Sequence, residues 1–155
     1  MVFKQVFIIV SVCVFLVGTQ SACKDTATKN SEKDTTISVE HTSPEDFIKG
    51  FYEGYISANL KMPVDYKQVD AMVDLSCTQS LIAYLDTAEL EYDPFLNAQD
   101  VFEAWLNHIK VEAHKTMPLC YWVYLDDPEN SNASVIVLIR LKKLGNDWKI
   151  DQILE

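Results

Sequence analysis

Hydrophobic and polar positions follow a helical spacing in the first half of residues 44–155 and a strand-like alternation in the second. Ser43 opens the helical half as a good N-cap residue, and the proline after it suits the first helical position. Apolar residues then recur at spacings of one and four over residues 47–56, which predicts an amphipathic helix. A second helical region is expected from about Tyr66, with a break near Ser76.

The second half of the domain has the patterns of β-strands. Residues 108–114 alternate strictly between polar and apolar, and residues 119–125 and 134–144 are rich in aromatic and β-branched side chains. A tight turn at residues 145–147 leads into a last strand over residues 148–154. Helices followed by four strands predict an α+β fold, with the N-terminal helices packed on one face of a four-stranded antiparallel meander.

The second and third predicted strands are apolar on both faces of the sheet. Successive residues over 119–125 and 135–139 are almost all apolar, and successive strand residues point to opposite faces. Helices can cover only one of these faces. A symmetric homodimer through the sheet is one way to cover the other.

The chain begins with the layout of a secretory signal peptide at residues 1–22. Its apolar run, Val6 to Val17, is too short for a membrane helix because a bilayer requires about 20 residues. Ser21-Ala22-Cys23 resembles a bacterial lipobox, in which the cysteine receives lipid, although Gln20 stands where lipoboxes usually carry leucine. The alternatives are an ordinary signal peptide, which leaves Cys23 unlipidated, and a retained membrane helix.

Residues 23–43 are predicted to be a lipid-anchor cysteine and a flexible tether. Thr, Ser and mixed charges dominate residues 24–42 and aromatic residues are absent, so the segment cannot bury enough apolar surface to fold alone. Residues 44–155 are then a single domain, anchored by lipid on Cys23 at the bacterial cell envelope and facing the periplasm or the cell surface. Without the lipid, the protein is expected to be secreted to the periplasm.

The formal net charge of the chain is −10, and no cluster of Lys and Arg forms a local basic patch. Such a chain repels nucleic-acid phosphates, so we expect no nucleic-acid partner.

Two cysteines, Cys77 and Cys120, remain for the folded domain once Cys13 leaves with the signal peptide and Cys23 carries lipid. In an oxidising compartment they can form a disulfide. The alternative is two separate buried thiols that pack as small apolar groups.

Three short stretches are spread along most of the length of residues 45–155. They are Phe51-Tyr52, the moderately specific segment from Tyr92 to Asp100, and the terminal Trp148-Lys149-Ile150-Asp151. Together they resemble the domain-of-unknown-function 3828 family of small bacterial extracytoplasmic proteins, many of them lipoproteins. The resemblance implies a nuclear transport factor two-like (cystatin-like) fold, in which helices and a curved sheet form a cone with a pocket. It implies no activity, because that fold hosts isomerases, dehydratases, binding modules and immunity proteins.

The segment between the predicted helices and strands carries the best candidates for a functional site. Asp93 and Asp100 are candidate catalytic acids or bases, since burial can raise the pKa of a carboxyl group. Asn97 and Gln99 are candidate ligand-binding residues. The structural alternative is that these side chains satisfy backbone groups of an irregular loop, with Asp100 capping the short helical piece that follows it.

Several aromatic residues can line an apolar pocket, although aromatic residues at such spacings more often form plain core. Trp122 is the ligand-binding candidate among them. The full set is Tyr52, Tyr55, Tyr84, Trp105, Trp122 and Trp148.

His108, Glu112 and His114 share one face of a predicted strand. The two histidines are roughly 20 Å apart along the strand, so one ion cannot bridge them. We expect no metal site and no cofactor, since the chain also lacks a glycine-rich phosphate loop.

These observations favour a lipid-anchored binding or interaction domain of the cell envelope, with a protein or a small molecule as ligand and no assigned catalysis. One alternative is a small pocket enzyme that uses Asp93 or Asp100 as its acid or base. Another is an acidic immunity protein that binds a basic secreted toxin.

Overall fold

The computed structural model describes residues 43–154. The signal peptide, the lipid site at Cys23 and the tether up to residue 42 lie outside the described residues and stay predictions. Within residues 43–154, no helix is both long enough and apolar enough to cross a membrane.

Three α-helices open the described chain at the places that the periodicity predicted: α1 (Pro44–Asn59), α2 (Tyr66–Ser76) and α3 (Gln79–Leu85). The Ser43 hydroxyl caps α1 by accepting a hydrogen bond from the Asp46 N–H at 3.0 Å. The break near Ser76 is confirmed, because Cys77 has an extended backbone and Thr78 caps α3.

Four strands follow and form one antiparallel sheet in the order β1-β2-β3-β4. The β3–β4 turn places Gly145 at a φ of 63°, a region that suits glycine. The predicted α+β fold with a four-stranded meander is confirmed, and the sheet is open and not closed into a barrel. The strands are β1 (Ile109–Ala113), β2 (Cys120–Leu125), β3 (Val135–Leu144) and β4 (Asp147–Leu154), with short 3₁₀ helices η1 (Glu103–Asn107) and η2 (Ser131–Ala133) before β1 and β3.

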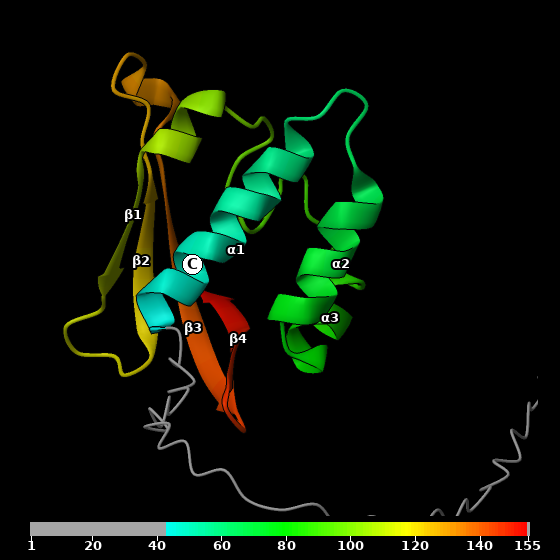
Figure 1. The fold of residues 1–155 in the computed structure, drawn as a ribbon, viewed down its shortest axis with the longest axis vertical. Coiled ribbons are helices and arrows are strands. Elements are labelled where there is room, and N and C mark those ends of the chain that lie inside the picture. The colour runs from blue at the N-terminus through cyan, green and yellow to red at the C-terminus, as the bar shows by residue number, and fades with distance from the viewer. Residues whose placement is uncertain (1–42, 155) are drawn as a thin grey trace, which may run out of the picture. The chain divides into compact units, whose positions relative to one another are not determined.

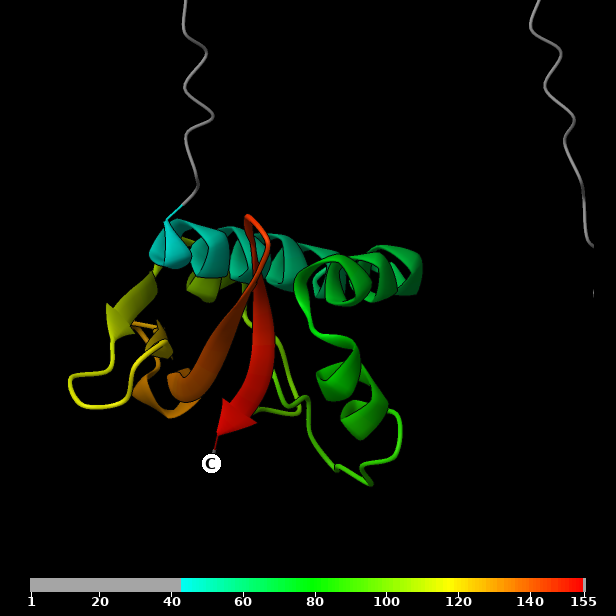
Figure 2. The same ribbon diagram turned by 90° about the horizontal axis from the view of Figure 1, so that it is seen from below.

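The core lies between α1 and one face of the sheet, while α2 and α3 lie beside the β4 edge (Figure 1, Figure 2). Burial of each large apolar side chain contributes about 1.5–3 kcal/mol, so this interface is the main source of stability. The indole N–H of buried Trp105 donates to Ala133 O at 2.9 Å, which ties η1 to the β2–β3 connection. The buried set from α1 is Ile48, Phe51, Tyr52, Tyr55 and Ile56, and the sheet contributes Tyr121, Val123, Leu125, Val137, Ile139, Leu141 and Ile150.

The opposite face of the sheet carries a second apolar set, as the sequence pattern predicted. Trp122 and Tyr124 are partly exposed there and alternate with the buried Tyr121 and Val123. Ile136 of β3 is 51% exposed on the same face. A homodimer through this face stays a prediction.

Cys77 and Cys120 are both buried free thiols, so the alternative of a disulfide between them is wrong. Cys77 lies beside Ile150 of β4, whereas Cys120 lies in β2 opposite Arg140 of β3. The cysteines are therefore three strand spacings apart, roughly 14 Å, and a disulfide requires Cα atoms within about 7 Å. Both thiols are instead buried separately, and the Cys120 Sγ atom accepts a hydrogen bond from the Arg140 Nε–H at 3.4 Å.

Candidate functional site

The loop between α3 and η1 is organised by the side chain of Asp93. One carboxyl oxygen, Oδ1, accepts hydrogen bonds from the N–H groups of Phe95 (2.9 Å) and Leu96 (3.2 Å). The Asp93 N–H donates to Ala98 O at 2.9 Å and closes the loop. Asn97, between them, has a φ of 48°, a left-handed conformation that asparagine tolerates better than most residues.

The same carboxyl group joins the loop to α1. The Tyr55 hydroxyl donates to the second oxygen, Oδ2, of Asp93 at 2.7 Å. The ring centroid of buried Phe95 lies 5.2 Å from the ring centroids of both Phe51 and Tyr55. The loop is therefore held to α1 by a hydrogen bond and by aromatic contacts. Burial raises the pKa of Asp93, and the hydrogen bonds from Tyr55, Phe95 and Leu96 oppose that rise.

Tyr52 lies one helical turn before Tyr55, and its hydroxyl is buried without a hydrogen-bond partner among residues 43–154. Burial raises its pKa, and the nearby Asp93 and Cys77 raise it further. Burial also raises the pKa of the Cys77 thiol to about 12. The Tyr52 hydroxyl and the Cys77 thiol are therefore neutral at ordinary pH.

Neither candidate acid is placed as a free base. Both oxygens of Asp93 hold hydrogen bonds of the loop and of α1, and it is Pro94, not Asp93, that lines the nearby cleft. Asp100 is exposed and forms no hydrogen bond with another described residue. Its predicted capping role is wrong, because η1 begins at Glu103 and Phe102 occupies the cap position without a side-chain bond.

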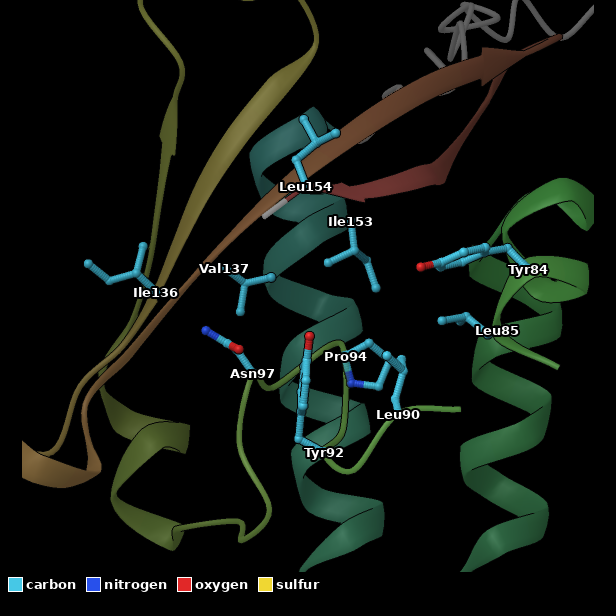
Figure 3. A pocket seen from close by; sticks show the side chains of 10 residues that line it. All are labelled: Tyr84, Leu85, Leu90, Tyr92, Pro94, Asn97, Ile136, Val137, Ile153 and Leu154. Atoms are coloured by element: carbon cyan, nitrogen blue, oxygen red, sulfur yellow. The ribbon is translucent and has the colours of Figure 1, made fainter. Parts of the chain in front are cut away.

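An open, largely apolar cleft of about 270 Å³ lies between α3, the loop and the ends of β3 and β4 (Figure 3). Its apolar walls come from three segments that are far apart in the sequence. The lining residues are Tyr84, Leu85, Leu90, Tyr92, Pro94, Asn97, Ile136, Val137, Ile153 and Leu154.

Three uncharged polar groups meet this cleft. The side chains of Tyr84 and Tyr92 point into it from two sides, and the Asn97 amide lies beside Val137 (Figure 3). None of the three side chains forms a hydrogen bond with another described residue. A second groove of about 390 Å³ shares Tyr84 and the end of β4 with the cleft and is also lined by Ser80, Asp151 and Gln152. The region thus offers apolar surface with a few open hydrogen-bonding groups, a composition typical of ligand sites.

The remaining candidates lie apart from one another. Gln99 supports the loop, since its Nε2 donates to Glu91 O at 3.3 Å. Trp122 lies on the outer face of the sheet, with its ring 5.7 Å from that of His114. The structure therefore brings Asn97 to the cleft and does not bring Trp122 there.

The histidines serve local structure. The Nδ1 atom of His108 lies 2.9 Å from Ala104 O, and the Nδ1 atom of His114 accepts a hydrogen bond from Met117 N–H at 3.0 Å. Within the described part of the chain, no group of three or more His, Cys, Asp or Glu side chains is placed to hold a metal ion.

Sequence reasoning missed most of the cleft. Tyr84, which is 58% exposed, was named only as one aromatic residue among several, and Leu90 and Ile153 were not singled out. The one available signal was the apolar pair Leu90 and Tyr92, which stands outside any helical or strand period just before Pro94.

The same substitution at the two buried tyrosines should have opposite effects on stability. Tyr52→Phe removes an unpaired buried hydroxyl and should raise the free energy of unfolding by about 1 kcal/mol. Tyr55→Phe removes the bond to Asp93 and should lower it by about 1.5–3 kcal/mol. Urea unfolding of the purified variants measures both, and equal effects of the two substitutions would contradict this assignment.

Comparison with known proteins finds a protein of the same fold but points to no activity. No family model matches the chain, and no curated protein matches it, so the resemblance to the domain-of-unknown-function 3828 family stays a prediction. A crystal structure of a protein of unknown function from Bacteroides thetaiotaomicron superposes with a TM-score of 0.64 at 21% identity. The match covers 72% of this chain and 88% of that one, which shows that the two proteins share a fold.

Proposed function

We propose that this protein is a non-catalytic binding module of the bacterial cell envelope. Lipid on Cys23 holds it at the membrane, the segment up to residue 43 acts as its tether, and the cleft is its binding site. The signal-like start of the sequence supports the location. The open cleft supports the binding role.

The observation that carries the binding role is the chemistry of the cleft lining. Seven of its ten residues are aliphatic or proline, and the other three are Tyr84, Tyr92 and Asn97. Among residues 43–154, no carboxylate, imidazole, thiol or amine lines the cleft, so these walls hold no group suited to proton transfer near neutral pH. Such walls suit the capture of an apolar group whose polar edges meet two hydroxyls and one amide.

The two alternatives, a pocket enzyme and an acidic protein that binds a basic partner, differ in how well the structure supports them. A pocket enzyme requires an acid or base in an open site, whereas Asp93 is occupied by three hydrogen bonds and Asp100 lies outside the cleft. An acidic binder of a basic protein is favoured by the charges around the cleft, where Glu89 and Glu91 are exposed and adjoin the cleft-lining Leu90.

Indole is a suitable probe of the cleft, because it combines an apolar ring with one N–H donor. We expect it to shift the amide NMR signals of Tyr92, Asn97 and Ile153 in the purified Cys23→Ala protein. Leu90→Trp should weaken indole binding at least about tenfold by filling the cleft, a loss of roughly 1.4 kcal/mol.

The matched control is Leu75→Trp. Leu75 is 73% exposed, lies on α2 and does not line the cleft, so the same substitution there should leave indole binding unchanged. Shifts that are absent, or that survive Leu90→Trp, would rule out this cleft as the binding site.

The membrane anchor has its own test. Cells that express the full-length protein with radioactive palmitate should incorporate label into it, and the protein should sediment with membranes. Cys23→Ala should abolish both results, whereas Cys13→Ala should preserve them because Cys13 leaves with the signal peptide. Unlabelled protein in the soluble fraction would refute the anchor.

A further inference from the structure

Three segments meet at the end of the domain where α1 begins. The loop of residues 114–119 joins β1 to β2 there, and the β3–β4 turn projects from the same end (Figure 1, Figure 2). The Leu141 N–H donates to Leu119 O at 2.7 Å, so the loop lies beside β3 just before the turn. Burial and the nearby charge of Glu45 raise the pKa of Tyr121, which places the start of α1 close to the start of β2. Residues 43–46, 114–119 and 142–147 are called the entry end below.

Unpaired lysines gather at the entry end. Lys115, Lys142 and Lys143 are exposed, and none of them forms an ion pair with another described residue. Elsewhere, lysines of α1, of the α1–α2 connection and of β1 each pair with an acid: Lys49 with Glu53, Lys61 with Asp65 and Lys110 with Glu112. The ammonium groups of the entry end can therefore meet an anionic partner without breaking an ion pair of the domain.

The acids of the entry end offset these charges only in part. Glu45 and Asp46 lie in the first turn of α1, where the positive end of the helix dipole opposes their charge. Asp46 also accepts a hydrogen bond from the Ser43 hydroxyl at 2.8 Å. Asp147 is the remaining acid, at the start of β4.

The opposite end of the domain is acidic. Glu103, Asp127 and Glu129 line one open depression beside η1 and the β2–β3 connection, and no described lysine or arginine lines it. Charge thus changes sign along the length of the sheet. An anionic surface attracts the entry end and repels the opposite end, which orients the domain.

The tips of the entry end are apolar. Leu119 is 44% exposed in the loop, and Leu144 is 46% exposed at the β3–β4 turn. Leu119 also has a φ of 59°, a conformation that is uncommon for a bulky residue and that suggests a use for its exposed position. The Lys143 Nζ atom lies 5.1 Å from the ring centroid of Trp148. Apolar and aromatic groups beside lysines are typical of side chains at a membrane–water interface.

The proposed tether keeps the entry end near the membrane. A flexible chain with the length of residues 24–42 spans about 24 Å on average. A domain of this size is roughly 35 Å across. The tether is therefore shorter than the domain that it carries, so the end at residue 43 is the part held closest to the lipid. Such tethering raises the local concentration and strengthens contacts that are weak between free partners.

We propose that the entry end docks on the anionic lipid surface to which the protein is anchored. The lysines of this end lie among the lipid headgroups, Leu119 and Leu144 enter the interface, and the acidic end points away from the membrane. This inference rests on the proposed lipid anchor and adds to it a fixed orientation of the domain.

The test supplies the anchor chemically, so that it does not depend on lipidation in cells. The purified protein from Cys23 onward is coupled through Cys23 to a maleimide lipid in vesicles. Cys77 and Cys120 are 3% and 1% exposed, so coupling at Cys23 is favoured. On vesicles with equal parts of phosphatidylglycerol and phosphatidylcholine, hydrogen exchange of residues 114–119 and 142–147 should slow at least about threefold relative to the uncoupled protein. Residues 126–131, at the acidic end, should not change.

Two matched double variants test the role of charge. Lys142→Gln with Lys143→Gln should lower the ratio of docked to free domain about thirtyfold and remove the slowing of exchange. Lys61→Gln with Lys67→Gln makes the same change in net charge beyond the far end of α1 and should preserve the slowing (Figure 1). Higher salt should reduce the slowing in the unsubstituted protein.

Leu119→Asn separates docking from stability. Asparagine tolerates a left-handed backbone better than leucine, so the urea concentration at half unfolding should stay the same or rise. The variant also removes an apolar tip, so the slowing of exchange on anionic vesicles should weaken.

Each contrary result has a definite meaning. If neither segment of the entry end is slowed, or if residues 126–131 are slowed instead, the docking is refuted, while the anchor at Cys23 is still decided by palmitate labelling. Equal slowing on vesicles of phosphatidylcholine alone would refute recognition of anionic lipid. Slowing in the uncoupled protein as its concentration rises would assign the entry end to a second copy and refute the lipid surface as its partner.

Discussion

One carboxyl group, that of Asp93, links the two elements on which the geometry of the cleft depends. It accepts two backbone N–H bonds within its own loop and one hydroxyl bond from Tyr55 of α1. The loop has little regular structure of its own, so these bonds, together with the packing of Phe95 against α1, fix the positions of its residues. With them, Phe95 and Leu96 are buried and Pro94 and Asn97 face the cleft.

The order of strands explains why the cleft lies where it does. α1 covers the inner face of the sheet, and α3 stands beside β4. β4 pairs with β3 only as far as Leu138, so the first residues of β3 extend past the described end of β4. The loop and α3 flank these residues, of which Val137 is buried and Ile136 is half exposed. The cleft thus lies where α3, the loop and the ends of β3 and β4 meet.

Much of the fold could be predicted from the sequence because the relevant signals are local. Ser43 and the proline after it mark the start of α1, the spacing of apolar residues marks its buried face, and Gly145 marks the last turn. The disulfide alternative failed because the distance between Cys77 and Cys120 depends on strand order. No local pattern reports that two strands lie between them.

The site was predicted less well for a similar reason. The loop that carries Asp93 was recognised as irregular and polar, and Asn97 does reach the cleft. The role of Asp93 depends on Tyr55, which lies 38 residues earlier, and on burial that the sequence does not reveal. Likewise, Leu90, Val137 and Ile153 become neighbours only through the packing of α3, the loop and the sheet. Contacts between distant segments, rather than any motif, create the site.

The central claim is that Asp93 supports a binding cleft and does not act as a base within it. The most direct measurement is the affinity of indole for the Tyr55→Phe protein under conditions where the protein is fully folded, with Tyr52→Phe as control. Tyr55 does not line the cleft, so its substitution acts only through Asp93 and the loop. The account predicts an affinity about five- to tenfold weaker, roughly 1 kcal/mol, in Tyr55→Phe and no change in Tyr52→Phe. Unchanged affinity in Tyr55→Phe would contradict it.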